Sequence, residues 1–124
     1  MERPGTYRRG EVQISGKITI GAAGAVSSFV CEAVDSSTGV VKTAAKTGRY
    51  TVTLLRKYRN PRMVGEPCLE GPTDAALTAT DGNEFFVRNL TGSSFDIQAR
   101  QTSYADANPA SGSVIHFTVA VQVL

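Results

Sequence analysis

The last eleven residues of the chain alternate between apolar and polar side chains with a period of two. Every odd position from Ile115 to Val123 is large and apolar, and the even positions include His116, Thr118 and Gln122. Successive side chains of a β-strand point to opposite faces of a sheet, whereas a helix would scatter these residues around its circumference. The pattern predicts a long strand that runs to the C-terminus and has one face in a core.

Shorter segments repeat this alternation. The sequence predicts further strands at residues 12–20, 29–34, 40–45, 50–54, 84–90 and 95–100. In the first of these, Ser15-Gly16 separates two apolar pairs, which predicts a bend or a bulge. Only residues 73–77 fit a short helix, which is too short to change the fold class.

Turn residues and prolines separate the predicted strands. A hairpin turn is predicted around Gly48, and further turns around Gly82 and Gly92. Proline cannot donate to a sheet ladder, so X-Pro pairs predict loops. There are four such pairs between strands: Asn60-Pro61, Glu66-Pro67, Gly71-Pro72 and Asn108-Pro109. Strand candidates thus recur about every ten residues, which is typical of an all-β antiparallel sandwich or jelly roll.

Length and composition favour one domain preceded by an arm. A domain of 124 residues buries about two thirds of the surface that its unfolded chain exposes, so residues 11–124 can form a single β-sandwich without a staple. Residues 1–10 hold three arginines, a proline and two glycines. They are predicted to form an extended N-terminal arm, and a disordered tail is the other interpretation.

Charge and hydropathy limit the partners. The net charge of +2 is too small to argue for nucleic acid. No apolar run approaches the roughly 18 residues of a membrane span. The N-terminus lacks the apolar stretch of a signal peptide, which predicts synthesis in a cytoplasm.

The residue types needed for catalysis or cofactor binding are sparse. Cys31 and Cys68 are predicted to be free, buried thiols, although their number also permits a disulfide. Together with His116, the single histidine, they do not form a metal site of usual spacing. We interpret His116 first as a surface residue, then as a subunit contact and last as a base, because nothing local supports a Cys–His pair. No enzyme activity and no cofactor are expected.

One segment concentrates basic residues beside an aromatic ring. It contains Arg56, Lys57, Tyr58, Arg59 and Arg62. Such a segment can bind an acidic protein surface or nucleic acid, and a solvated strand end is the other interpretation. Because Glu66 and Glu70 follow closely and dilute the positive field, direct nucleic-acid binding is not expected.

Two strand-and-turn motifs occur in the later part of the chain. Residues 48–54 follow the pattern G-x-Y-x-V-x-L, and residues 106–119 follow D-x-x-P-x-x-G-x-x-x-x-F-x-V. Over residues 40–124 the chain resembles small β-sandwich virion proteins of tailed bacteriophages, which serve as capsid decoration (cement) proteins or as head-fibre and tail components. The resemblance implies a jelly roll of the trimeric C1q or tumour-necrosis-factor type.

The resemblance also implies a function. We expect a structural virion protein that is made in the host cytoplasm, binds the major capsid protein on the outer capsid surface and stabilises the shell as a homotrimer through multivalent contacts. The predicted partner-binding residues are Arg3, Tyr7, Arg8, Arg9, Arg56, Lys57, Tyr58, Arg59 and Arg62, and the predicted oligomer interface contains His116, Thr118 and Gln122. The alternative is a receptor- or glycan-binding module of a tail or head fibre, which requires exposed loop aromatics, with Tyr104 and Tyr58 as candidates. A small hydrolase is the third possibility.

Overall fold

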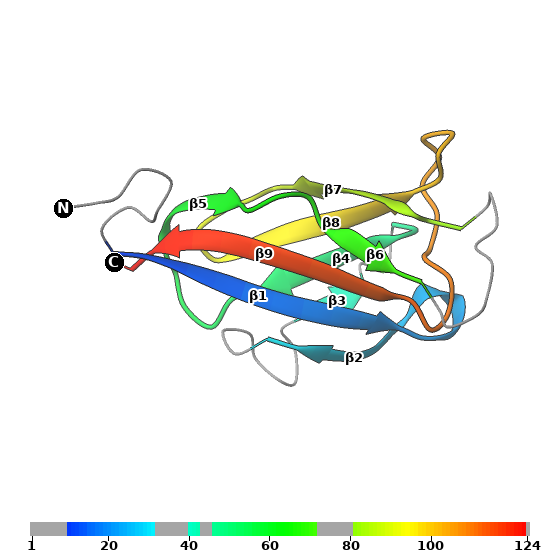
Figure 1. Cartoon of the computed structure of the whole chain (residues 1–124), viewed down its shortest axis with the longest axis horizontal. Coiled ribbons are helices and arrows are strands. Elements are labelled where there is room, and N and C mark those ends of the chain that lie inside the picture. The colour runs from blue at the N-terminus through cyan, green and yellow to red at the C-terminus, as the bar shows by residue number, and fades with distance from the viewer. Residues whose placement is uncertain (1–9, 32–39, 43–45, 72–80, 124) are drawn as a thin grey trace.

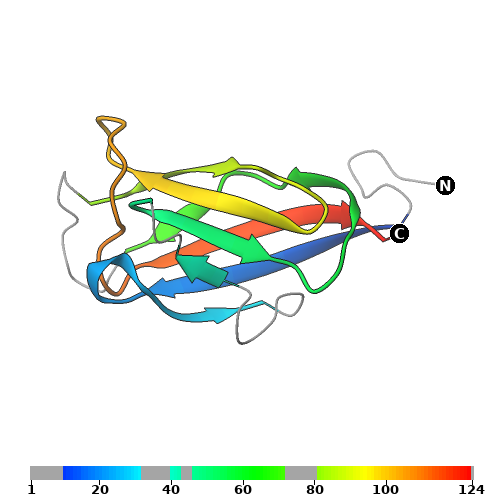
Figure 2. The same ribbon diagram turned by 180° about the vertical axis from the view of Figure 1, so that it is seen from behind.

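Two antiparallel β-sheets pack face to face in the computed structural model of the chain, which describes residues 10–31, 40–42, 46–71 and 81–123 (Figures 1 and 2). The first sheet contains β1 (Glu11–Ile20), β2 (Val26–Val30), β5 (Arg59–Met63), β6 (Cys68–Glu70) and β9 (Val114–Gln122). The second sheet contains β3 (Val40–Lys42), β4 (Arg49–Thr53), β7 (Glu84–Arg88) and β8 (Ser94–Arg100). Within the described ranges, helical structure is limited to one 3-10 turn, η1 (Ala22–Gly24). The predicted all-β antiparallel fold is therefore confirmed.

Strand β9 lies inside the first sheet, with β1 on one side and both β5 and β6 on the other. It pairs with β1 over nine consecutive residue pairs without interruption. Its odd side chains from Ile115 to Val121 are buried, as the period-two pattern predicts. The strand ends at Gln122 and does not run to the C-terminus as predicted, since Val123 follows it and is 36% exposed. Residue 124 lies outside the described residues.

The inward faces of the two sheets form one hydrophobic core. Its largest fully buried apolar side chains are Tyr50, Phe95, Ile18, Ile20, Ile97, Ile115, Val52, Val119 and Val121. The rings of Phe95 and Phe117 meet across the sheets edge to face, with centroids 5.4 Å apart. Such a pair adds about 0.5–1.5 kcal/mol to the free energy gained from burial. The Tyr50 hydroxyl, within the core, donates a 2.6 Å hydrogen bond to the carbonyl of Gly24.

The predicted bend or bulge at Ser15-Gly16 is wrong. Strand β1 passes through both residues in unbroken register with β9, and the irregularity of β1 lies at Thr19/Ile20, opposite β2. The glycine is needed for space. A Cβ atom at Gly16 would lie 2.6 Å from Cζ of Phe117, so glycine lets the aromatic ring pack against the backbone.

The predicted loop at Asn60-Pro61 is also wrong, because both residues lie in β5. This strand is at the edge of the sheet, and its ladder with β9 shifts register between Arg59 and Arg62. An edge position with an irregular ladder is where a strand tolerates a proline. Strand β6 was not predicted, since three residues are too few to show a period. It pairs with β9 beyond β5.

Other boundaries differ modestly from prediction. Strand β2 begins at Val26, three residues before the predicted start, and ends at Val30, so it leaves out Cys31, which was predicted within it; β7 ends at Arg88, two residues before the predicted end. The predicted strand ends at 32–34 and 43–45, the short helix at 73–77 and the arm residues 1–9 lie outside the described residues. Strand β1 begins at Glu11.

The two cysteines are free, as predicted. The strand register places them three strands apart. Cys68 in β6 pairs with His116 in β9, which pairs with Lys17 in β1, which pairs with Val30 in β2, the residue before Cys31. Three spacings of about 4.8 Å exceed the Cα separation of roughly 7 Å that a disulfide spans. The predicted burial is wrong for Cys68, which is exposed, and Cys31 is half-buried.

Candidate functional site

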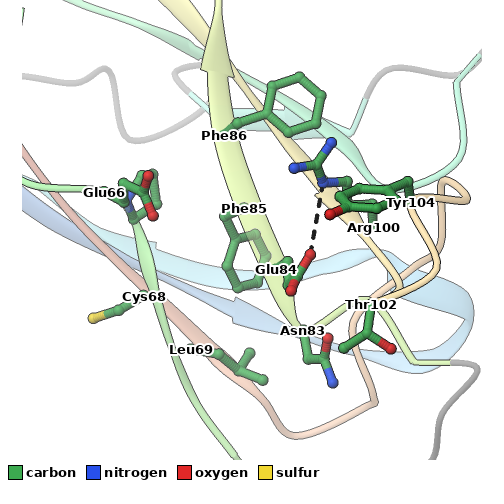
Figure 3. Close-up of a pocket in the computed structure, with 11 residues that line it drawn as sticks. Glu66, Cys68, Leu69, Asn83, Glu84, Phe85, Phe86, Arg100, Thr102 and Tyr104 are labelled. Atoms are coloured by element: carbon green, nitrogen blue, oxygen red, sulfur yellow. Dashed lines mark ion pairs between the residues drawn. The ribbon is translucent and has the colours of Figure 1, made fainter.

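A groove of about 770 Å³ lies beside β7, within the range of roughly 300–1,000 Å³ that ligand sites occupy. Figure 3 shows its two sides: Glu66, Cys68 and Leu69 come from the β6 side, and Phe86, Arg100 and Tyr104 lie on the other side of β7. Glu84 and Asn83 lie between them (Figure 3). The groove thus collects residues from two sheets and from the loop after β8, and sequence reasoning did not predict it.

The main feature of this groove is a stack of three side chains. The guanidinium of Arg100 lies 4.8 Å from the ring centroid of Phe86 and 4.7 Å from that of Tyr104. Alternation along the paired strands β7 and β8 explains the first contact, because Phe86 and Arg100 share the outer face of the second sheet. Cation–π attraction holds both rings against the guanidinium plane.

Tyr104 belongs to a closed loop. A β-bridge between Arg100 and Asp106 closes it, and the Tyr104 amide donates a 2.9 Å hydrogen bond to the carbonyl of Gln101. The Gln101 amide in turn bonds the carbonyl of Ala105 at 2.8 Å. Tyr104 has a positive φ of 72° and is 71% exposed. The loop therefore presents an aromatic ring to solvent in a defined position.

Polar groups flank the stack. Glu84 Oε2 lies 3.8 Å from Nε of Arg100, an ion-pair distance but too long for a hydrogen bond. Among the described residues, Arg100 Nε and Asn83 Oδ1 are buried and have no hydrogen-bond partner. The groove can bind a polar ligand with an apolar face.

The basic residues of the 56–62 segment gather at one end of the sandwich, which we call the basic pole: Arg56, Lys57, Arg59 and Arg62. Here β5 begins next to the end of β9 and the start of β1 (Figure 1). The Val123 amide donates to the Gly10 carbonyl at 3.1 Å, so the segment that precedes Gly10 departs from this pole. The four side chains are exposed, as a docking surface requires.

Tyr58 does not share this surface. It is only 8% exposed and belongs to the core, while Arg56 lies 5.2 Å from its ring centroid. Of the two tyrosines in the predicted partner-binding set, Tyr58 is therefore not on the surface and cannot serve as an exposed loop aromatic. An amphipathic ring next to basic residues gives no local signal of which way it points. Arg3, Tyr7, Arg8 and Arg9 lie outside the described residues.

Arg62 is the basic-pole residue with a clear role in stability. Its Nη2 donates a 2.6 Å hydrogen bond to Oε1 of Glu11, whose side chain is fully buried. Arg62→Met is expected to lower the free energy of unfolding by about 1–2 kcal/mol. Losing one partner of a fully buried pair costs roughly 3–5 kcal/mol, but the Arg62 side chain is 49% exposed and solvent screens the pair.

Urea denaturation measures this loss, with Lys57→Met as the control. Lys57 is exposed and has no ion pair within the described part of the chain. An equal loss in both variants would show that the Glu11 carboxylate does not depend on Arg62.

The predicted oligomer-interface residues share the outer face of the first sheet. Each has a side-chain partner within the chain: His116 Nε2 lies 2.8 Å from Glu70 Oε1, Thr118 Oγ1 lies 2.8 Å from Ser15 Oγ, and Gln122 accepts a hydrogen bond from Asn60. All three remain half-buried and reachable from solvent. The interface itself stays a prediction.

Strand β6 also brings together a thiol, an imidazole and a carboxylate. Cys68 is the register partner of His116, and Glu70 bonds His116 from the same strand as Cys68. Register partners on one face have Cβ atoms about 5 Å apart. The Cys–His pair that the sequence did not support is therefore adjacent in space. However, these residues lie on an open sheet face, and Cys68 does not line the depression of about 260 Å³ to which His116 contributes. Neither this depression nor the groove beside β7 has both the thiol and the imidazole in its lining.

In the described ranges, no group of three or more His, Cys, Asp or Glu side chains is arranged to hold a metal ion. The same ranges contain no helix of the length and apolarity needed to cross a bilayer. Comparison of the chain with protein-family models, curated proteins and solved structures gave no match.

Proposed function

We propose that the chain is a structural virion protein of the capsid decoration type. It attaches to the major capsid protein on the outer surface of a phage capsid and stabilises the shell as a homotrimer. The observation that carries the proposal is the basic pole, where the exposed members of the predicted partner-binding segment lie beside the point from which residues 1–9 depart. Two basic segments far apart in the sequence can thereby act on one acidic partner surface.

The charges of the basic pole favour an external partner. Glu11 is the acidic side chain in the strand that begins at this pole, and its carboxylate is bonded to Arg62. Arg59 Nη2 donates a 3.1 Å hydrogen bond to the Val123 carbonyl, a neutral acceptor, so this contact does not neutralise the charge of the guanidinium. Positive side chains with few acidic neighbours steer association with an acidic surface and fix its register.

The jelly-roll assignment is part of the same proposal. In a jelly roll, antiparallel strands form two sheets and the chain passes repeatedly from one sheet to the other. Here the chain passes between the sheets from β4 to β5, from β6 to β7 and from β8 to β9, and β9 pairs with β1. The outer face of the first sheet, with His116, Thr118 and Gln122, supplies the trimer contact.

Co-sedimentation with capsid shells that lack this protein tests the proposal. We expect the wild-type protein to sediment with the shells and the variant Arg56→Ala/Lys57→Ala/Arg59→Ala to bind about tenfold more weakly or worse, because lost contacts multiply in a trimer. The matched control is Lys42→Ala/Lys46→Ala/Arg49→Ala, which removes three positive charges from the second sheet and its β3–β4 loop, away from both the basic pole and the proposed trimer face. Arg62 is left unchanged because of its bond to Glu11.

Deleting residues 1–9 completes the experiment. Since β1 begins at Glu11 and Gly10 bonds Val123, we expect this deletion to keep the melting temperature and weaken capsid binding. Sedimentation velocity of the free protein reports whether it is a trimer. If the wild-type protein stays in the supernatant, the proposed capsid role is wrong. If the two triple variants bind equally well, the basic pole is not the docking surface.

The alternative role, a receptor- or glycan-binding module, has a different observation in its favour. Tyr104 is an exposed loop aromatic, as that role requires, and it borders the groove beside β7. The groove and the basic pole lie near opposite ends of the sandwich, so both roles are physically compatible in one molecule.

A further inference from the structure

We infer that the groove beside β7 is a binding site for a neutral saccharide, with Tyr104 as the platform on which a sugar ring stacks. The inference gives the alternative glycan-binding role a site and a ligand class. It does not depend on capsid attachment.

The first argument is the state of the Tyr104 ring. One face of the Tyr104 ring lies against the Arg100 guanidinium, whose Cζ is 4.7 Å from the ring centroid. Tyr104 nevertheless remains 71% exposed. A single exposed aromatic ring is common on a protein surface, but a ring held in place by a stacked guanidinium offers a rigid, flat contact face. A pyranose ring has a face of C–H groups that can cover such a ring, while its hydroxyls remain free for polar contacts.

The second argument is the set of groups around the ring. Asn83, Glu84 and Thr102 line the same groove and provide an amide, a carboxylate and a hydroxyl. Their Oδ1, carboxylate and hydroxyl oxygens accept hydrogen bonds, whereas the guanidinium of Arg100 only donates. Sugar hydroxyls both donate and accept hydrogen bonds, so they match a site that contains both donors and acceptors.

The third argument is charge, which selects against other ligands. The groove holds two carboxylates, Glu66 and Glu84, and one guanidinium, Arg100. Nucleic acid also stacks on aromatic rings, but its phosphates would meet the carboxylates. The same carboxylates disfavour sialylated or sulfated sugars. A neutral saccharide encounters no such repulsion, so its affinity should depend little on salt.

The fourth argument is preorganisation. The loop that carries Tyr104 is closed by the Arg100–Asp106 bridge and by two internal backbone hydrogen bonds. Stacking on Arg100 fixes the ring itself. A site that is already ordered pays little conformational entropy when it binds.

A glycan array that carries neutral, sialylated and sulfated glycans tests the inference, followed by titration of the best neutral glycan into ¹⁵N-labelled full-length protein. We expect binding to neutral glycans, with amide shifts confined to residues 83–86 and 100–104. Tyr104→Ala should bind roughly tenfold more weakly or worse, because it removes the central contact. Tyr104→Phe keeps the ring and should bind nearly as well as the wild type.

Leu55→Ala is the matched control, since Leu55 is another exposed large apolar residue, 60% exposed, at the other end of the sandwich. It should bind like the wild type. Absence of binding to every neutral glycan, shifts confined to residues 55–62, or equal affinity of Tyr104→Ala and the wild type would each overturn the inference. Binding only to sialylated or sulfated glycans would overturn its charge argument, and therefore the ligand class. None of these results would alter the outcome of the capsid experiment, because that experiment depends on the basic pole.

Discussion

Gly48→Ala is expected to lower the free energy of unfolding by about 2–5 kcal/mol, a large part of the roughly 5–15 kcal/mol that stabilises a typical domain. Two costs add together. Gly48 has a φ of +70°, which an L-residue adopts at a cost of about 1–2 kcal/mol. In addition, a Cβ atom here would lie 2.3 Å from the carbonyl oxygen of Ala107 and 2.8 Å from that of Ala99.

The surrounding backbone cannot move easily to relieve this overlap. The Gly48 amide bonds Oδ1 of Asn108 at 2.9 Å, and its carbonyl accepts a 2.7 Å hydrogen bond from the Ala99 amide. A Cβ atom at Gly82 would also lie 2.3 Å from the carbonyl oxygen of Ala107. Because Ala107 contacts both Gly48 and Gly82, its backbone cannot shift away from a new methyl group at residue 48 without overlapping Gly82.

Gly65→Ala is the control for this prediction. Gly65 has nearly the same φ, +73°, but a Cβ atom there meets nothing within 4 Å. Its loss should be limited to the backbone cost of about 1–2 kcal/mol. Urea denaturation followed by circular dichroism compares the two variants. If Gly48→Ala is no less stable than Gly65→Ala, the close approach of Ala107 to Gly48 does not exist in solution.

Raising the pH from 10 to 12 is expected to remove up to about 3 kcal/mol of stability from the wild-type protein through Tyr50. Tyr50 is fully buried, and desolvation by burial raises its pKa from the usual 10.0 to about 12. The unfolded chain therefore loses this proton at a lower pH than the folded protein. The contribution of Tyr50 is complete below pH 10 and is lost as the pH rises through 12.

Tyr50→Phe isolates this effect from the titration of other groups. The variant loses the hydrogen bond from the Tyr50 hydroxyl to the Gly24 carbonyl, so at neutral pH it should be about 1–2 kcal/mol less stable than the wild type. The gap should close and then reverse as the pH rises from 10 to 12, because phenylalanine does not titrate and the loss expected in the wild type exceeds about 1–2 kcal/mol. Urea titrations at pH 8, 10, 11 and 12 measure the gap. A gap that stays constant over this range would show that Tyr50 titrates normally in the fold.

The structure also guides the choice of variants for functional work. Arg62 lies in the predicted partner-binding segment, yet its bond to buried Glu11 means that its loss would confuse weak binding with weak folding. Tyr58 is unsuitable for the same reason, because it belongs to the core. Arg56, Lys57 and Arg59 can be replaced with less risk, since their side chains are exposed.

The proximity of Cys68, His116 and Glu70 illustrates how topology creates arrangements that no local pattern announces. Strand β6 places the thiol opposite the imidazole, and a second residue of the same strand bonds that imidazole. Nucleophilic catalysis also needs a substrate pocket and donors for the developing charge. Neither the groove beside β7 nor the depression beside His116 contains both side chains, so we base no function on the pair.

Local sequence by itself determined the strands with a clean period of two. The inward faces of β4, β8 and β9 follow directly from alternation, and the turn at Gly48 follows from the need for a positive φ. Alternation predicts the orientation of a side chain but not what covers it. Gln98 alternates with the inward-facing Ile97 and Ala99 and lies on the outer face of β8, yet it is fully buried, and its side chain donates to the Thr47 carbonyl and accepts from Arg49 Nε.

Only the tertiary structure decided the pairing of strands, and with it the candidate sites. The placement of β5 and β6 along β9 and the inward turn of Tyr58 depend on contacts between segments far apart in the chain. The stack of Phe86, Arg100 and Tyr104 likewise needs two paired strands and the loop that follows them. Backbone hydrogen bonds between strands are nearly the same for every residue type, so local sequence specifies which face of a strand is buried far better than which strand lies beside it.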